Sequence, residues 1–248
     1  MLEGRLRCRV RDLGFSSFSE YLAYAKSHAE EHEAFVNQVT TNETYFFRTP
    51  RVWDYVENTF LPQWYSEHAN RTLKVWSAAS STGEEAHTLG ILMQHFKDNH
   101  VGFEYQITGT DIDTKVISTA TLGVYKGRSV ERFRQAKPDW FSQYMNGDDD
   151  KGYTVLPAIK SRIRFSQLNL FSSAPATEKM NLVLLRNVLI YFTASDQERV
   201  MNSVHRRLDS NGVAIIGESE SLNSLQTSFE SIAPTIYRPC GSSISKAA

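Results

Sequence analysis

Hydrophobic positions in the first 40 residues repeat with the spacing of α-helices. Leu6 and Val10 fall on one face of a helix that Gly14 is placed to end. Ser17 or Ser19 is suited to cap a second helix. A third helix is expected around the apolar positions Phe35, Val36 and Val39. The N-terminal part of the chain is therefore predicted to be helical.

The pattern changes near residue 72, where short apolar runs begin to alternate with helical stretches. The runs expected as strands cover 73–79, 105–110, 182–185, 213–216 and 235–238. Alternating strands and helices with short connections predict a parallel sheet covered by helices, and so an α/β fold. Two strand-like runs, Tyr153–Leu156 and Arg162–Gln167, interrupt this alternation, and we interpret them as a small β insertion.

These patterns divide the chain into three parts. Residues 1–50 are predicted to form a small N-terminal helical domain. Residues 51–71 follow Pro50, which fits the first turn of a helix, and are expected to form a linker helix. Residues 72–248 are expected to form the larger domain, with the β insertion at about 147–168 inside it.

Composition excludes several classes of function. The 27 basic and 28 acidic residues leave a formal net charge of −1, which argues against a broadly basic surface for nucleic acid. No apolar run is long enough to span a membrane, so membrane insertion is not expected. Cys8 and Cys240 lie near opposite ends, outside any metal-ligand spacing, which favours the cytoplasm and predicts no metal site.

Several ligand motifs are absent from the sequence. It contains no phosphate-binding P-loop and no G-x-G-x-x-G dinucleotide motif. The segment from His28 to His32 matches the zinc-protease pattern H-x-x-E-H, but its neighbours are charged and no third ligand is evident. We interpret this segment as a solvated helix.

The first crossing from strand to helix carries an unusual pair of carboxylates. Small residues including Ala78 lead to a tight turn at Gly83, followed by Glu84 and Glu85 at the start of a helix. These acids could simply complement the helix dipole. The functional alternative is a ligand that carries positive charge and no phosphate. Because Asp111 ends the next strand, where such folds place a ribose-binding acid, S-adenosylmethionine fits this alternative.

Four segments in this order resemble the CheR-type methyltransferases, which methylate glutamates of bacterial chemoreceptors. They are 41–48 (TNETYFFR), 76–85 (WSAASSTGEE), 111–114 (DIDT) and 186–192 (RNVLIYF). The resemblance extends from about Arg5 to Tyr237. It implies a class I S-adenosylmethionine-dependent methyltransferase sheet, which is Rossmann-like, after a small N-terminal helical domain. The implied product of the cofactor is S-adenosylhomocysteine, and the implied product of the substrate is a glutamyl methyl ester.

The resemblance also implies roles for individual residues. Arg48 and Tyr191 are expected to be catalytic, with Arg48 holding the attacking carboxylate and Tyr191 lying near the transferred methyl group. The structural alternatives are an interdomain salt bridge for Arg48 and a core aromatic for Tyr191. The cofactor-binding residues are expected to be Asn42, Thr44, Arg48, Ala78, Gly83, Glu85, Asp111, Asn169, Leu170, Arg186 and Asn187.

The implied partner is the acidic methylation region of a chemoreceptor cytoplasmic domain. The basic residues proposed to dock it are Arg5, Arg7, Arg9 and Arg11, on the first helix. An ordinary solvated helix face is the alternative for these arginines. We expect a monomer, and whether the β insertion holds a receptor peptide stays open.

The sequence departs from the family pattern at a few positions. The N-terminal domain looks short, because family members usually carry another helix before the arginine-rich one. Glu218 stands where a histidine is common, Leu185 where a cysteine is common, and Ala86 and His87 where Pro-Tyr is common. Two functional alternatives remain, a methyltransferase of a related receptor-like signalling array and a non-catalytic module that senses the cofactor.

Overall fold

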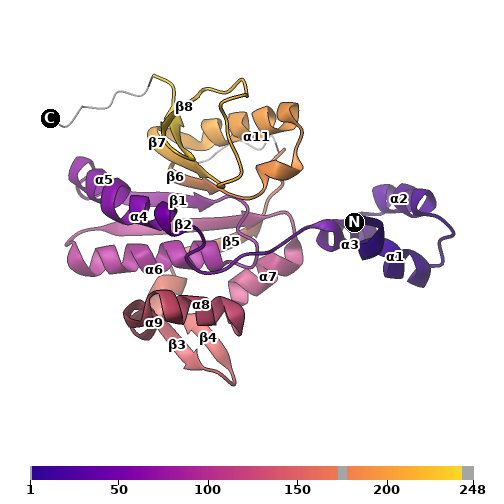
Figure 1. The fold of residues 1–248 in the computed structure, drawn as a ribbon, viewed down its shortest axis with the longest axis horizontal. Helices are drawn as coiled ribbons and strands as arrows, with labels where there is room; N and C mark the ends of the chain where they lie inside the picture. The colour runs from indigo at the N-terminus through magenta and orange to yellow at the C-terminus, as the bar shows by residue number, and fades with distance from the viewer. Residues whose placement is uncertain (1, 173–177, 242–248) are drawn as a thin grey trace.

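The computed structural model describes residues 2–172 and 178–241, and it places a seven-stranded sheet beside a group of three N-terminal helices (Figure 1). The strands are β1 (Thr72–Ser77), β2 (Glu104–Asp111), β3 (Met145–Asp148), β4 (Gly152–Val155), β5 (Ile163–Gln167), β6 (Met180–Leu185), β7 (Leu208–Ile216), β8 (Phe229–Ala233) and β9 (Ile236–Pro239). The longer helices are α1 (Leu2–Asp12), α2 (Phe18–Ser27), α3 (Ala29–Val39), α6 (Glu84–Asn99), α7 (Thr114–Leu122), α8 (Arg128–Ala136) and α11 (Ala194–Arg207). The shorter helical segments are α4 (Pro50–Tyr55), η1 (Val56–Phe60), α5 (Leu61–Glu67), α9 (Pro138–Tyr144), α10 (Pro157–Lys160) and η2 (Leu189–Tyr191).

The three N-terminal helices pack around their own small core. Leu6 and Val10 of α1 are buried against Tyr21 and Ala25 of α2. Ser17, rather than Ser19, caps α2, since its hydroxyl accepts the backbone N–H of Glu20. The predicted helices of this region are therefore present.

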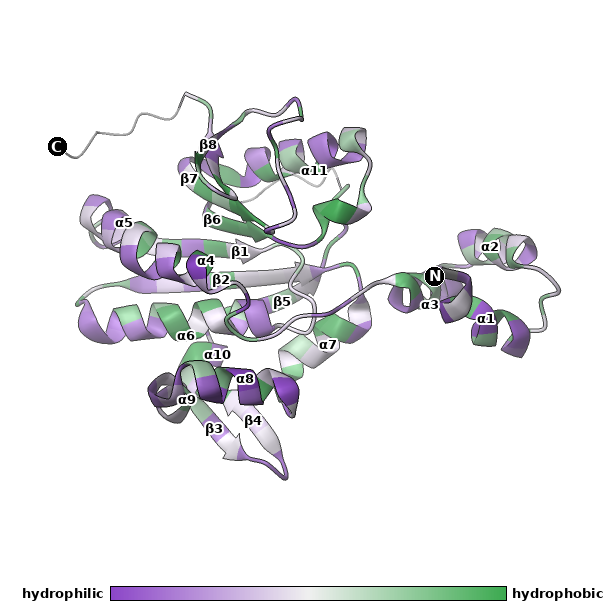
Figure 2. Cartoon of the chain, viewed as in Figure 1, coloured by the Kyte–Doolittle hydropathy of each residue, from purple (hydrophilic) through white to green (hydrophobic). Residues whose placement is uncertain are grey.

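The sheet has the strand order β5-β2-β1-β6-β7-β9-β8. The first five strands are parallel and β9 runs antiparallel to both of its neighbours. Figure 2 shows the hydrophobic central strands β6 and β7, which are covered by helices with mixed surfaces. The chain proceeds from β1 toward one edge and later returns to β6 on the other side of β1. In a parallel sheet, such a switch point opens a crevice at the carboxyl ends of the strands.

The predicted β insertion at about 147–168 is wrong in its C-terminal half. Its two-stranded sheet consists of β3 and β4, which flank a turn at 149–151. Strand β5 instead joins the main sheet, where it pairs in parallel with β2, from Ile107 opposite Ile163 to Asp111 opposite Gln167. Because β5 is an edge strand with exposed positions, it lacks the continuous apolar run of the central strands.

The segment predicted as a linker helix at 51–71 packs into the main core of the larger domain. Val52, Trp53 and Leu61 are fully buried in the cluster that also contains the strand residues Leu73 and Val75. The helix widens into a π-turn, η1, just before α5, whose first turn contains a proline. A proline inside a helix lacks the N–H that an α-turn requires, which accounts for the widened turn.

Candidate functional site

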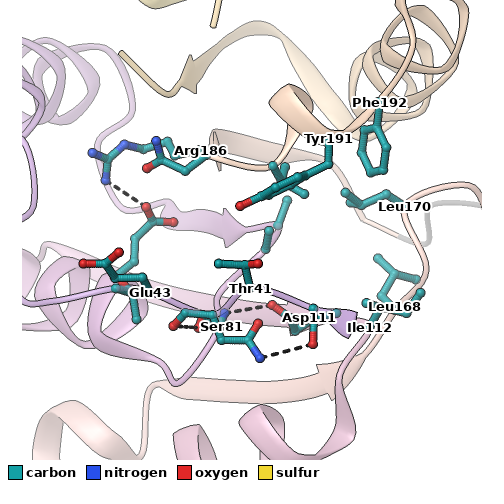
Figure 3. A pocket seen from close by; sticks show the side chains of 18 of the residues that line it. Thr41, Glu43, Ser81, Asp111, Ile112, Leu168, Leu170, Arg186, Tyr191 and Phe192 are labelled. Carbon is teal, nitrogen blue, oxygen red and sulfur yellow. Dashed lines mark hydrogen bonds and ion pairs between the residues drawn. The ribbon is translucent and has the colours of Figure 1, made fainter. Parts of the chain in front are cut away.

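A cavity of about 510 Å³ lies at the carboxyl ends of β1, β2 and β6, at the switch point of the sheet. The segment between α3 and α4 covers one side of it, and the segments after β5 and β6 cover the other. Figure 3 shows Asp111, Arg186 and Tyr191 approaching this cavity from three different elements. Its position is the one that open α/β sheets use for ligands.

Asp111 lies at the end of β2, and two backbone N–H groups fix its carboxylate. Ser81 donates to one oxygen at 2.9 Å and Asp113 donates to the other at 3.1 Å. Burial raises the pKa of Asp111, while these two hydrogen bonds oppose the shift. A carboxylate oxygen has two lone pairs, so both oxygens retain capacity for the hydroxyl groups of a ligand.

Glu85 and Arg186 form a buried ion pair at the floor of the cavity. Arg186 donates to Glu85 at 2.9 Å, and the two side chains are 2% and 11% exposed. Ser77 donates its hydroxyl to the other Glu85 oxygen at 2.7 Å, and Arg186 also donates to the carbonyl of Arg48. Within the described residues, the Nε of Arg186 has no hydrogen-bond partner. The pair leaves lone pairs on Glu85 that are suited to an amine.

The segment between α3 and α4 is fastened to the sheet by polar contacts. The side-chain amide of Asn42 donates to Asp113 at 2.8 Å, and the Asn42 carbonyl accepts the hydroxyl of Ser81 at 2.9 Å. Thr44 and Arg48 line the cavity further along. Arg48 donates to the backbone carbonyl of Glu43 at 2.8 Å. In the part of the chain that the structure describes, Arg48 forms no ion pair, which excludes the predicted alternative of a salt bridge there.

Tyr191 ends the short helix η2 and is 58% exposed, so it is not the core aromatic that was the alternative for this residue. Its hydroxyl points into the cavity in Figure 3. The loop that carries it is held by the buried carboxylate of Glu220, which accepts the N–H groups of Asn187 at 3.1 Å and Leu189 at 2.8 Å. Asn187 has a φ of 59°, a left-handed conformation that asparagine tolerates better than most residues.

The opposite end of the cavity is apolar. Figure 3 shows Ile112, Leu168 and Leu170 grouped there beside Phe192. Phe192 lines the cavity, and its ring lies 5.1 Å from that of Phe171. Such a slot suits a flat aromatic base.

All but one of the predicted cofactor residues line this cavity. The exception is Gly83, which lies in the turn before α6 with a φ of 95°. A Cβ at this position would lie 2.8 Å from the side chains of Ala120 and Tyr125. Gly83 therefore shapes the turn, and its contact with a cofactor stays a prediction.

Sequence reasoning missed several lining residues, since it followed only motif positions with recognisable chemistry. They are Val39, Thr40, Thr41, Glu43, Ala79, Ser81, Ile112, Leu168, Phe171, Val188 and Phe192. Position relative to the motifs gives a signal for some of them, because Ile112 lies between two motif acids and Leu168 precedes Asn169. Nothing local identifies Phe171.

The four arginines of α1 have different environments. Arg5 donates to the carbonyls of Val39 and Thr40 at 2.8 and 2.7 Å, and Arg9 forms a forked pair with Glu31. These two therefore hold the helical domain together. Arg11 pairs with its neighbour Asp12 and is exposed, as is Arg7.

The H-x-x-E-H segment has a structural explanation. Glu31, its acidic member, is buried and accepts hydrogen bonds from Arg9 and from the hydroxyl of Tyr21. Among residues 2–172 and 178–241, no group of three potential metal ligands comes together. None of the helices described there is long and apolar enough to cross a membrane.

The donor set of the cavity fits S-adenosylmethionine. Asp111 offers acceptors suited to a ribose, Glu85 and Glu43 offer negative charge suited to an amine and a sulfonium, and the apolar end of the cavity is suited to an adenine. The sheet order and this site together define a class I S-adenosylmethionine-dependent methyltransferase.

The chain belongs to the CheR methyltransferase family. Residues 42–238 match the family model of the CheR methyltransferase SAM-binding domain, and residues 1–40 match that of the CheR methyltransferase all-alpha domain. The two models thus meet near residue 41, whereas the sequence pattern predicted a boundary at 50. Family membership implies that the chain is a methyltransferase of chemotaxis signalling.

Several known proteins are similar to the chain over nearly its whole length. The chemotaxis protein methyltransferase of Borreliella burgdorferi is 28% identical over 96% of this chain and 85% of the relative. That of Klebsiella aerogenes is 31% identical over 96% of this chain and 80% of the relative. Among solved structures, a TehB-like SAM-dependent methyltransferase from Corynebacterium glutamicum has a TM-score of 0.36 and 15% identity, with 78% of this chain and 72% of that chain covered.

Proposed function

We propose that the protein transfers the methyl group of S-adenosylmethionine to glutamate side chains of chemoreceptor cytoplasmic domains, and that it does so in the cytoplasm as a monomer. The product would be a γ-glutamyl methyl ester. The observation that carries this proposal is the guanidinium of Arg48, which lines the cavity with no carboxylate partner among the described residues. It offers two parallel N–H groups to an incoming carboxylate.

The reaction needs positioning more than proton transfer. A glutamate carboxylate has an ordinary pKa of about 4.3, so it is ionised at neutral pH and needs no general base. The cofactor supplies an electrophilic methyl group bound to a sulfonium sulfur. Arg48 would orient the attacking oxygen, and the exposed Tyr191 at the cavity would hold that oxygen in line with the methyl group.

The binding residues would fix the cofactor against this attack. Glu85 would accept from the amine while remaining paired with Arg186, and Asp111 would accept from the ribose hydroxyls. Because the floor of the cavity is buried, water is kept from the ion pair and its electrostatic effect is greater than at the surface.

The test uses methyl-labelled S-adenosylmethionine and membranes rich in chemoreceptors. We expect label that mild alkali releases as methanol, the behaviour of a carboxyl methyl ester. The Arg48→Lys variant should lose about a hundredfold in kcat, because a lysine cannot form the forked pair. Arg51→Lys is the matched control, since Arg51 is half exposed and pairs with Glu218 at 3.3 Å.

Cofactor binding without alkali-labile incorporation on any receptor tried would overturn the proposal. It would instead favour a non-catalytic module that senses the cofactor. If the Arg48→Lys and Arg51→Lys variants are equally active, the proposed role of Arg48 is wrong, although the proposed reaction is not contradicted.

A further inference from the structure

A chain of cation–π contacts leads out of the cavity along the protein surface. The guanidinium of Arg48, at the cavity, lies 5.8 Å from the ring centre of Tyr45. The guanidinium of Arg132, on α8, lies 4.4 Å from the same ring. Tyr45 therefore links the proposed catalytic arginine to a second arginine from an element outside the cavity.

Helix α8 is amphipathic, and its buried face fixes it beside this segment. Val130 and Phe133 are 1% and 0% exposed. The ring of Phe133 lies 5.4 Å from that of Phe46 and 4.8 Å from that of Phe47. Because Phe46 and Phe47 follow Tyr45 directly, the position of α8 relative to the cavity mouth is set by core packing.

The exposed face of α8 carries positive charge without an internal counter-ion. Arg128 and Arg132 are exposed, and within residues 2–172 and 178–241 neither forms an ion pair. The acid of this helix, Glu131, is paired with Arg134, which also pairs with Asp149. Figure 2 shows the strongly hydrophilic positions of α8 next to its hydrophobic ones.

The basic surface of α1 is smaller than its sequence suggests. Arg5 and Arg9 bond within the helical domain and Arg11 pairs with Asp12. Only Arg7 among these four has neither an ion pair nor a side-chain hydrogen bond in the described part of the chain. Among the described residues, α8 therefore presents two exposed arginines without ion pairs, Arg128 and Arg132, whereas α1 presents only Arg7.

We propose that Arg128 and Arg132 of α8, with Tyr45, form a docking surface for an acidic segment of the polypeptide whose carboxylate enters the cavity. This inference rests on the proposed function and adds to it the surface that recognises the substrate. Acidic side chains flanking the target glutamate would lie over α8 and Tyr45. Such rim charges speed association and select the partner more than they add affinity.

The experiment measures binding and methyl transfer separately, with the purified full-length chain and a soluble cytoplasmic fragment of a chemoreceptor from the same genome. Arg132→Glu and Arg128→Glu are the test variants. The matched control is Arg164→Glu, because Arg164 is an exposed arginine on the edge strand β5 and does not line the cavity. Affinity for S-adenosylmethionine, measured alone, shows that each variant is folded.

We expect Arg132→Glu to weaken binding of the fragment and to raise its KM about fivefold, and the double variant to do more. The dependence of binding on salt should become shallower, whereas cofactor affinity and kcat stay within about twofold of wild type. Arg164→Glu should behave as wild type.

The inference is overturned if Arg132→Glu and Arg164→Glu bind the fragment equally, if charge reversal at Arg7 alone removes binding, or if the wild-type chain shows no salt-dependent binding. If the wild-type chain binds the fragment through Arg132 but transfers no methyl group, the docking surface stands and the proposed reaction fails. The two proposals are thus distinguished by which measurement changes.

Discussion

Replacing Glu220 with glutamine tests whether the loop that carries Asn187 and Tyr191 is held by one buried carboxylate. One oxygen of Glu220 accepts from Leu189 at 2.8 Å and more weakly from Ile190 at 3.4 Å. The other accepts from Asn187 at 3.1 Å and from the N–H of residue 217 at 2.5 Å. A glutamine retains one acceptor and turns an NH₂ group toward two of these donors.

The magnitude follows from the two hydrogen bonds lost. A hydrogen bond to a charged group contributes about 1.5–3 kcal/mol, and the donors left facing the NH₂ group are desolvated as well. We therefore expect Glu220→Gln to destabilise the closed conformation of the loop by at least about 3 kcal/mol. The loop then opens locally while the sheet stays folded. If methyl transfer requires Tyr191 to be held in place, the same cost of about 3 kcal/mol appears in the activation free energy. Because about 1.4 kcal/mol corresponds to a tenfold change in rate, kcat should fall about a hundredfold.

The assay compares kcat for methyl transfer with cofactor affinity and thermal unfolding. The control is Glu218→Gln, two residues away, because Glu218 is about half exposed and its pair with Arg51 contributes less than about 1 kcal/mol. A folded Glu220→Gln variant with kcat within threefold of wild type would refute the reasoning. It would mean that Gln197, which donates to the carbonyls of Leu189 and Phe192, holds the loop sufficiently.

Three further substitutions test the surroundings of the site. Gly83→Ala should lower the free energy of unfolding by about 2–4 kcal/mol, because the backbone φ is 95° and the new Cβ would lie 2.8 Å from the hydroxyl of Tyr125. An unchanged urea midpoint of unfolding would contradict this prediction. Glu85→Gln should lower the free energy of unfolding by about 3 kcal/mol or more, since it leaves the buried Arg186 without its counter-ion. It should also abolish cofactor binding in calorimetry, and a cofactor affinity equal to that of wild type would contradict this prediction. Burial lowers the pKa of His87 to about 4. Between about pH 6.5 and 4 this histidine is therefore protonated in the unfolded chain but not in the folded one. The free energy of unfolding falls by about 3 kcal/mol as the pH drops through this window. The His87→Gln variant should lose that part of the pH dependence, and identical pH profiles would rule out His87 as its source.

Much of the fold is readable from the sequence because the central strands are buried on both faces. The apolar runs around Val75 and Leu184 stand out, and their helices follow with regular spacing. The site is also largely readable, since parallel strands bring the residues after each carboxyl end to one edge. Glu85 and Asp111 therefore line the same cavity although 26 positions separate their numbers.

Other features depend on contacts that no local pattern contains. The edge strand β5 is polar enough to look like part of a hairpin, and only its pairing with β2 assigns it to the main sheet. Arg9 and Glu31 lie 22 positions apart, so their ion pair is set by the packing of three helices. This pair occupies one of the four α1 arginines that the sequence predicts for docking. The carboxylate of Glu220 acts through backbone N–H groups, which leave no trace in side-chain motifs.

Hydrogen bonds to Asp113 connect the segment that follows the helical domain to the sheet. Thr40 and Asn42 both donate to Asp113, which caps α7 and whose N–H donates to Asp111. The orientation of the helical domain and the position of the Asp111 carboxylate, the proposed ribose acceptor, therefore depend on one short loop. If the two are coupled, thermodynamic linkage requires that cofactor binding and the orientation of the helical domain stabilise each other by the same coupling free energy. We therefore expect the helical domain to support cofactor binding as well as to recognise a partner.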